Sequence, residues 1–479
     1  MENYILHLSE LKTAENLQRV IVEKLFPNTP SFNIEGGVSN RVNSFLNALR
    51  DDLCVVIETE YVDKDYRDAY YRLYSTKLKT YERNCVRLSF FYEGLQPLLE
   101  NIVTASDNEI KELQNGYLGF VVLRPLKPCI GRNVLSPLAI KGCAGISICG
   151  IRVHTSCLGL KLEVWGFPHA SQDSQLMTCA ETTLWAVSEY FGEKYSHYSR
   201  VFPHSIIDML RDSVYERQIP SHGLTYDKIS RVLQRQHFEC KIYHKRDSRF
   251  KELFDCYVES EFPIIVLLEG DDTQGTHFGH AIVCIGQKIQ GRDRIFGVTP
   301  TTINGIKVFN WNNAPDKYVS IDDNMTPYKV FDFSQPTIHY GNPDWINTRI
   351  TCFIVPLHPK IYIEAAEAIG ISEQVIAHLH PAGSELYVRT LLTTSRSYRE
   401  YVLRNEDLTN NTKEMLLSIN LPKFVWVTEV SHKESFLNNK IDEIVLIDAT
   451  ADSNDGISAV IEHLRLTNPI EAFENLNQV

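Results

Sequence analysis

The sequence predicts an α+β protein that is divided into about two or three domains. Its 479 residues exceed the size at which a single hydrophobic core usually stops growing. The composition is that of a globular protein, with 43% hydrophobic and 23% charged residues. From about Gly166 onward the expected helices precede the expected strands, whereas a doubly wound α/β domain alternates them.

Residues 1–165 form the first expected domain, an α+β unit of unknown role. A strand-like run begins at Cys54 and continues into a long helical stretch, in which Tyr66, Tyr70 and Tyr74 recur at helical spacing. A buried strand is expected from Tyr117, and it leaves through a loop punctuated by prolines. This segment is a candidate for regulation or scaffolding, including the binding of a regulatory protein.

Residues 166–359 form the second expected domain, in which helices pack on an antiparallel sheet. An amphipathic helix is expected from Cys179, with the hydroxyl of Thr178 as its amino-terminal cap and Gly192 as its terminator. Its apolar stripe consists of Ala180, Leu184, Val187 and Phe191. A second helix is expected around Ile229. The strands that follow are expected in "ECKIYH", "FPIIVLLEG", "GHAIVCIGQKI" and "DKYVSIDDN".

Residues 360–479 form a carboxy-terminal α/β extension, short enough to pack onto the preceding domain. Two helical stretches are expected in this segment, in "KIYIEAAEAIG" and "ELYVRTLLTTSRSYREYVLR". Two strands are expected after them, in "KFVWVTEV" and "DEIVLIDATA". The extension is a second candidate for contact with a regulatory partner.

Charge and hydropathy exclude several functional classes. The formal net charge is −12, from 48 Lys plus Arg and 60 Asp plus Glu. An acidic chain is a poor candidate for nucleic-acid binding, which depends on neutralising phosphates. The most apolar windows are too short to span a bilayer, and the first residues lack the pattern of a secretory signal. The sequence therefore predicts a soluble, cytoplasmic protein that does not bind membranes.

The eleven cysteines give no metal pattern. The densest group is Cys143, Cys149 and Cys157, and its spacing does not match the close pairs that zinc sites use. We expect reduced, buried thiols there. No metal and no cofactor is expected.

Cys179 is the candidate nucleophile. A free thiol with a pKa of about 8.5 is mostly protonated at neutral pH and needs activation. A helix amino terminus supplies partial positive charge, and an imidazole supplies a partner for the ion pair. Taken alone, however, a cysteine at a helix start is more often a buried, inert residue.

The activating imidazole is expected from His280, which follows Gly279 at the start of an apolar strand. A carboxylate on a neighbouring strand would orient the imidazole ring. The candidates are Asp322 and Asp323, at the end of a later strand. Adjacent strand residues face opposite ways, so we expect one of them, preferably Asp322, to reach the histidine.

Two glutamines ahead of the cysteine are candidates for the oxyanion donor. Gln172 lies seven residues before Cys179, and Gln175 lies four before it. With the backbone amide of Cys179, a carboxamide at either position could hold the developing negative charge.

The order of these features along the chain resembles that of papain-like cysteine peptidases. It is a glutamine, then a cysteine that opens a helix, then "GH" at the start of an apolar strand, then an acid after a later strand. The chain resembles most closely the bacteriocin-processing, double-glycine group, through "SQDSQLMTCAETTLWAV", "HGLTYDKISRVLQRQ", "FPIIVLL", "GHAIVCIG" and "IDDN". The resemblance covers about Pro168 to Leu357. Papain-like enzymes usually place the glutamine about six residues ahead of the cysteine, so Gln172 is the closer match. Ala180 stands where this group often has glycine.

The resemblance implies a papain-like catalytic domain and a thiol hydrolase, a cysteine peptidase or isopeptidase that acts on a protein or peptide. Two other interpretations stay open at this point. A transglutaminase, deamidase or acyltransferase would use the same triad. A papain-like domain without catalytic activity could serve as a binding scaffold.

Overall fold

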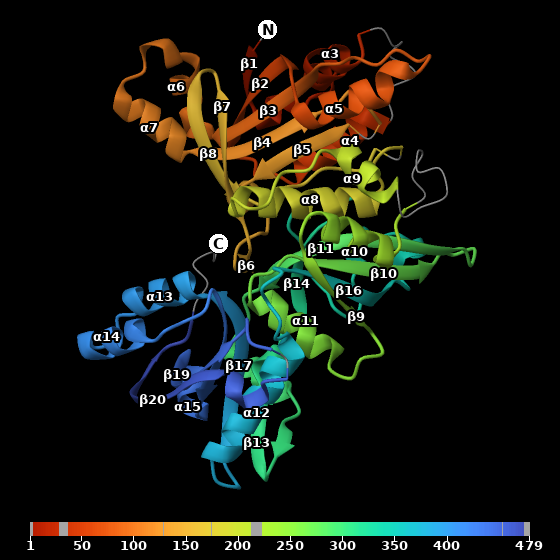
Figure 1. The fold of residues 1–479 in the computed structure, drawn as a ribbon. Coiled ribbons are helices and arrows are strands. Elements are labelled where there is room, and N and C mark those ends of the chain that lie inside the picture. The colour runs from red at the N-terminus through yellow and green to blue at the C-terminus, as the bar shows by residue number, and fades with distance from the viewer. Residues whose placement is uncertain are drawn as a thin grey trace.

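The computed structural model describes residues 3–27, 37–127, 129–173, 175–211, 223–452 and 454–473. Within these residues the chain forms three sheets and a two-stranded hairpin, together with helices that pack between and around them (Figure 1). Pairing within the sheets is antiparallel except between β13 (Ile306–Asn310) and β17 (Glu385–Thr394). The α+β class predicted from the sequence is confirmed.

The first sheet is an antiparallel meander in the order β1-β2-β3-β4-β5. Its strands are β1 (Asn3–His7), β2 (Leu53–Tyr61), β3 (Cys85–Tyr92), β4 (Tyr117–Leu123) and β5 (Ile130–Leu135). The hairpin of β7 (Ile151–Cys157) and β8 (Leu160–Gly166) alternates buried and exposed residues. That pattern is typical of a strand pair with one face covered and one face in solvent.

The central sheet carries the candidate histidine and has the order β15-β14-β11-β10-β16-β9, with β6 paired to β11. Its strands are β6 (Ile146–Ile148), β9 (Glu239–His244), β10 (Ile264–Asp271), β11 (His277–Lys288), β14 (Lys317–Ile321), β15 (Lys329–Asp332) and β16 (Arg349–Leu357). The four strands predicted between residues 166 and 359 are all present. Since β11 and β14 are neighbours, the segments that contain His280 and Asp322 meet.

The third sheet has the order β12-β13-β17-β18-β19-β20 and lies in the carboxy-terminal half of the molecule (Figure 1). Its remaining strands are β12 (Thr301–Ile303), β18 (Phe424–Ser431), β19 (Lys440–Asp448) and β20 (Val460–Glu471). The two strands predicted in this segment are present as β18 and β19.

Helices cover each sheet. Those before residue 120 are α1 (Leu8–Leu11), α2 (Ala14–Asn16), α3 (Glu23–Leu25), α4 (Gly37–Asn47), α5 (Lys64–Arg72), α6 (Gln96–Glu100) and α7 (Asp107–Asn115). The later ones are α8 (Cys179–Lys194), α9 (Pro203–Leu210), α10 (Tyr226–Arg235), α11 (Phe250–Glu259), α12 (Ala365–Leu379), α13 (Ser395–Arg404), α14 (Asn410–Ser418) and α15 (Lys433–Leu437). None of the described helices has the length and apolar character needed to cross a membrane.

Helix α8 is sandwiched between the first sheet and the central sheet (Figure 1). The prediction of an amphipathic helix is wrong, because every residue from Ala180 to Phe191 is buried. Polar residues on the expected solvent face bond to neighbouring elements instead. The Thr183 hydroxyl donates to the carbonyl of Ala281 at 3.1 Å, and Glu189 pairs with Arg132 at 3.3 Å. A helix buried on all sides is a core element.

Three further expectations differ from the structure. Gly192 lies inside α8, which continues to Lys194. The long helix expected after the first strand ends at Arg72. The stretch "ELYVRTLLTT", expected to be helical, is strand β17, with seven consecutive buried residues between β13 and β18. Burial on both faces favours a strand in this segment. The boundary with helix α13 is not visible in the sequence, because no glycine or proline separates the two elements.

Strand pairing crosses both of the predicted domain boundaries, the one after residue 165 and the one after residue 359. The division into domains stays a prediction. Strand β6, from the segment 1–165, pairs with β11 of the central sheet. Strand β13, from the segment 166–359, pairs with β17 of the carboxy-terminal segment. The three segments therefore share sheets and are tied to one another through backbone hydrogen bonds.

A buried charge network also joins the central and third sheets. Arg389 on β17 donates to Glu429 at 2.7 Å and to Glu259 on α11 at 2.9 Å, and all three side chains are buried. Replacing Arg389 with Leu would remove the guanidinium that pairs with both buried carboxylates. We expect the free energy of unfolding to fall by about 3–5 kcal/mol, measured by denaturant titration.

The matched control is Arg404→Leu, which removes an exposed pair with Glu400 within α13. That change should cost less than about 1 kcal/mol. Equal losses in the two variants would contradict a structural role for the Arg389 network.

Candidate functional site

Cys179 is the first residue of α8, as the sequence predicts. Thr178 is the N-cap, and its backbone N–H donates to the carboxylate of Glu181 at 3.1 Å, which fixes the start of the helix. All eleven cysteines lie within the described residues as free thiols. Nine are buried, whereas Cys179 and Cys240 are half-buried. Cys179 therefore combines partial access with the positive end of a sixteen-residue helix.

The loop before Cys179 is folded around one carboxylate. The buried Asp173 accepts the backbone N–H groups of Gln175, Leu176 and Met177 at 3.0, 2.8 and 2.8 Å. Charge-assisted bonds of this kind are strong. The loop therefore reaches the helix start in a defined conformation.

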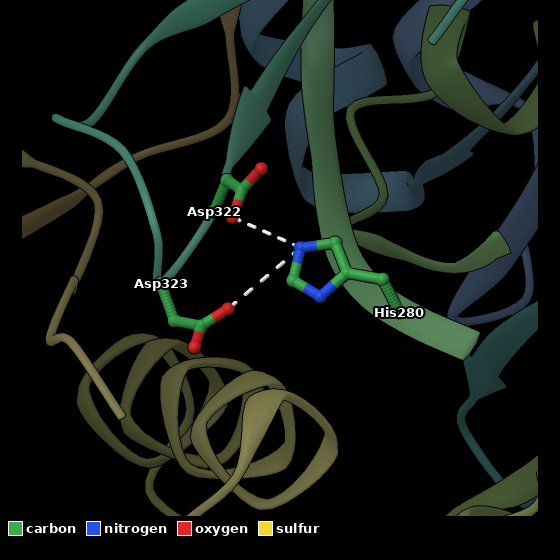
Figure 2. Close-up of side chains that lie close together, drawn as sticks. All are labelled: His280, Asp322 and Asp323. Atoms are coloured by element: carbon green, nitrogen blue, oxygen red, sulfur yellow. Dashed lines mark hydrogen bonds and ion pairs between the residues drawn. The ribbon is translucent and has the colours of Figure 1, made fainter. Parts of the chain in front are cut away.

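His280 and Asp322 come together because β11 and β14 are adjacent antiparallel strands, with Val283 opposite Ile321. The His280 Nε2 atom lies 3.0 Å from Asp322 Oδ1 (Figure 2). Both side chains are almost fully buried, at 3% and 2% exposure. The pair is thus shielded from water. Electrostatic interactions are stronger in such a buried environment than in solvent.

Aromatic residues of the segment between β15 and β16 cover this pair. The Tyr340 hydroxyl lies 2.6 Å from Asp322 Oδ2 and 3.2 Å from His280 Nε2. The Trp345 ring meets the His280 ring edge-on, with 5.2 Å between centroids. Sequence reasoning missed both residues, which belong to no motif that it used.

The electrostatics of the site favour an imidazolium–carboxylate pair. Burial alone would lower the pKa of His280, but the charge of Asp322, its hydrogen bond and a hydrogen bond with the Cys179 thiol raise that pKa well above its ordinary value. Burial would conversely raise the pKa of Asp322, and the charge of His280, with hydrogen bonds from His280, Tyr340 and the Asn324 amide, holds it below its usual range.

The carboxyl groups lie at one of the two ring nitrogens of His280. Nε2 is directed at the carboxyl groups, and Figure 2 shows the other ring nitrogen on the side of the helix. The thiol of Cys179, at the start of that helix, is within hydrogen-bonding reach of the ring. The structure therefore brings the three predicted residues into one chain of contacts: thiol, imidazole and carboxylate.

Asp323 also approaches His280, at 3.8 Å, but makes no hydrogen bond to it. Both aspartates follow the end of β14 at Ile321 and lie in a turn, so the alternation expected along a strand does not separate them (Figure 2). Neither carboxylate oxygen of Asp323 has a hydrogen-bond partner. Burial, followed by the charge of Asp322, raises the pKa of Asp323 to about 7, against the opposing charges of His280 and Arg41.

The two candidate glutamines are turned in different directions. Gln172 Nε2 donates to Asn324 Oδ1 at 3.1 Å, in the turn that carries Asp322. The Gln175 side chain instead accepts a hydrogen bond from Lys77, in the amino-terminal segment. Of the two, Gln172 lies beside the candidate site.

Residues of the first 170 positions complete the site, and sequence reasoning missed them. His169 Nε2 donates to the carbonyl of Asp322 at 3.0 Å, and Asn133 donates to its Nδ1 at 2.9 Å. Burial lowers the pKa of His169 to about 4, so its ring is neutral. Arg41 on α4 donates to the carbonyl of Asp323 and to the Ser171 hydroxyl, both at 3.2 Å. These contacts fix the backbone of the Asp322–Asp323 turn.

Among the described residues, His280, Asp322 and Asp323 place ligand atoms within 4.8 Å of one another, close enough to hold a metal ion. The Nε2 atom that would bind the ion already contacts Asp322 and Tyr340.

Cys143, Cys149 and Cys157 are buried free thiols. Ser174 and His222, from the stretches that carry the family resemblance, lie outside the described residues.

The buried Asp323 gives a pH-dependent prediction for stability. An aspartate ionises near pH 3.9 in the unfolded chain, but only near pH 7 in the folded one. The unfolded state therefore binds fewer protons between these values, and stability falls as pH rises through the window. Asp323→Asn removes this penalty. We expect the variant to be more stable than wild type at pH 7.5, by on the order of 2–4 kcal/mol.

The difference between the two proteins should shrink toward pH 4, and thermal unfolding across the range measures it. A difference that stays constant with pH would show that Asp323 ionises normally in the folded protein.

Comparison with known proteins finds no family model that matches the chain and no curated protein that matches it. What the site can do chemically therefore follows from the arrangement of Cys179, His280 and Asp322.

Proposed function

We propose that the protein is a thiol hydrolase, a cysteine peptidase or isopeptidase that acts on a protein or peptide substrate. One observation carries the proposal: a half-buried thiol at a helix amino terminus lies within reach of a buried imidazole, and the Nε2 atom of that ring is hydrogen-bonded to a buried carboxylate. A nucleophile, a base in contact with it and a third group that orients the base are the parts that covalent acyl transfer requires.

The reaction assigns a role to each group. The Cys179 sulfur attacks the carbonyl carbon, and the C–O π electrons move to the oxygen. The Cys179 amide and the Gln172 carboxamide hold this oxyanion. Gln172 gives one amide hydrogen to Asn324, and a carboxamide nitrogen carries a second hydrogen that remains for the substrate.

His280 moves the protons. Its Nδ1–H protonates the leaving amine as the C–N bond breaks and the thioester forms. The neutral ring then takes a proton from water, the resulting hydroxide attacks the thioester, and the acid product leaves as the thiolate is restored. Asp322 holds the ring and stabilises its charged form throughout.

The fold supports a papain-like interpretation. A central helix begins at the cysteine and packs on an antiparallel sheet that carries the histidine on one strand. The acid follows the neighbouring strand.

The eleven free cysteines suit a reducing compartment, which favours the cytoplasm. Transfer to an amine and hydrolysis share the first half of the reaction, so the acceptor distinguishes them.

Thiol reactivity tests the activation of Cys179. With a limiting amount of iodoacetamide near pH 6, we expect Cys179 to be alkylated at least about tenfold faster than a free thiol, because the His280 imidazolium stabilises the thiolate. Peptide mass spectrometry measures the rate. Cys240 is the internal control, since it is also half-buried but donates its hydrogen to the carbonyl of Ser230.

His280→Gln should bring the Cys179 rate down to that of Cys240. A Cys179 in the wild type that reacts no faster than a free thiol would overturn the proposal.

The bond that is broken is identified with a peptide library, incubated with wild type and with Cys179→Ala in the presence and absence of an amine. Hydrolysis by the wild type alone is the expected result. Amine adducts without cleavage would assign the protein to the transferases.

A further inference from the structure

We infer that Tyr340 is a positioning residue of this site: its hydroxyl holds Asp322 so that the carboxylate accepts from His280 Nε2 and leaves Nδ1 free for Cys179. This inference rests on the proposed function and adds a residue that belongs to none of the motifs in the sequence.

The direction of the hydrogen bonds follows from their chemistry. Tyr340 Oη lies 2.6 Å from Asp322 Oδ2, and a carboxylate can only accept. The tyrosine therefore donates its single hydrogen to Asp322. Burial and the charge of Asp322 both hold the pKa of Tyr340 far above its ordinary value, so the hydrogen is retained.

Once that hydrogen is committed, the Tyr340 oxygen presents lone pairs to the histidine ring. His280 Nε2 then faces two acceptors, Asp322 Oδ1 at 3.0 Å and Tyr340 Oη at 3.2 Å. If Nε2 carried no hydrogen, its lone pair would face the lone pairs of Asp322 Oδ1 and Tyr340 Oη, which is repulsive. Nε2 therefore keeps its hydrogen through the reaction, and Nδ1 is the nitrogen that exchanges a proton with the substrate.

Asp322 depends on few donors because it is buried. Besides His280, its carboxylate accepts from the Asn324 amide at 3.0 Å and from Tyr340. With 2% of the side chain exposed, water does not replace a donor that is lost. Removing the tyrosine hydroxyl would leave Oδ2 without a donor.

The tyrosine is held in place by its own segment. Its ring stacks on Trp345 at 4.5 Å with 20° between the planes, and the Thr337 hydroxyl donates to the carbonyl of Trp345 at 2.6 Å. Asp344 accepts the backbone N–H of Thr273, at 3.0 Å, in the hairpin between β10 and β11. The hydroxyl is thus oriented before substrate binds.

Tyr340→Phe tests the inference, because it keeps the stacking on Trp345 and removes the hydroxyl. We expect alkylation of Cys179 by iodoacetamide near pH 6 to slow by about tenfold or more, the effect of losing a hydrogen bond to a charged group. The matched control is Tyr401→Phe, which removes a hydrogen bond of the same 2.6 Å length to the carbonyl of Glu471, away from the site. This control should react at the wild-type rate.

A double-mutant cycle separates positioning from a general structural role. If Tyr340 acts through Asp322, adding Tyr340→Phe to Asp322→Ala should slow alkylation no further than Asp322→Ala alone. Rate losses that multiply in the double variant would overturn the inference.

The failures of the two proposals are distinguishable. If wild-type Cys179 is activated and Tyr340→Phe reacts equally fast, the positioning inference alone is wrong. If wild-type Cys179 reacts no faster than a free thiol, the proposed function fails and the inference fails with it.

Discussion

The buried contact between His280 and Asp322 is the interaction on which the candidate site depends. Removing an ionised pair from water is costly unless further hydrogen bonds complete its coordination. Asp322 meets this requirement with donors to its carboxylate from His280, Tyr340 and Asn324, and a donor to its carbonyl from His169. Asn324 lies in the same turn as Asp322, but His280, Tyr340 and His169 come from three other parts of the chain, so the full set of donors exists only when these parts are assembled.

This dependence explains why the first segment is built into the candidate site. Helix α8 lies between the first sheet and the central sheet, and it is buried on all sides (Figure 1). Arg41 and His169 reach across to the Asp322–Asp323 turn, and Arg124 donates to the carbonyl of Ser171, just before the loop that leads to Cys179. The amino-terminal segment therefore supports the site directly, in addition to any role in binding a partner.

The sequence predicted the three central residues because each has a local context that carries chemistry. Cys179 opens a helix, His280 lies on an apolar strand and Asp322 follows a strand. The choice between Gln172 and Gln175 required their partners, Asn324 and Lys77.

Other features could not be found from local context. Arg41 contacts a residue 282 positions away, and nothing in the sequence around it indicates that contact. The burial of α8 was missed for the same reason, since the partners of Thr183 and Glu189 lie on other elements. In β17, burial between two strands outweighed the expected helical pattern. Tertiary context decided each of these cases.

The central claim is that one thiol of this chain is a nucleophile, and labelling with an electrophilic thiol probe tests it most directly. Intact-protein mass spectrometry with limiting probe should find one adduct on the wild type, located at Cys179, and no rapid adduct on Cys179→Ala. Equal labelling of the two proteins, or labelling spread over several of the eleven cysteines, would contradict the account.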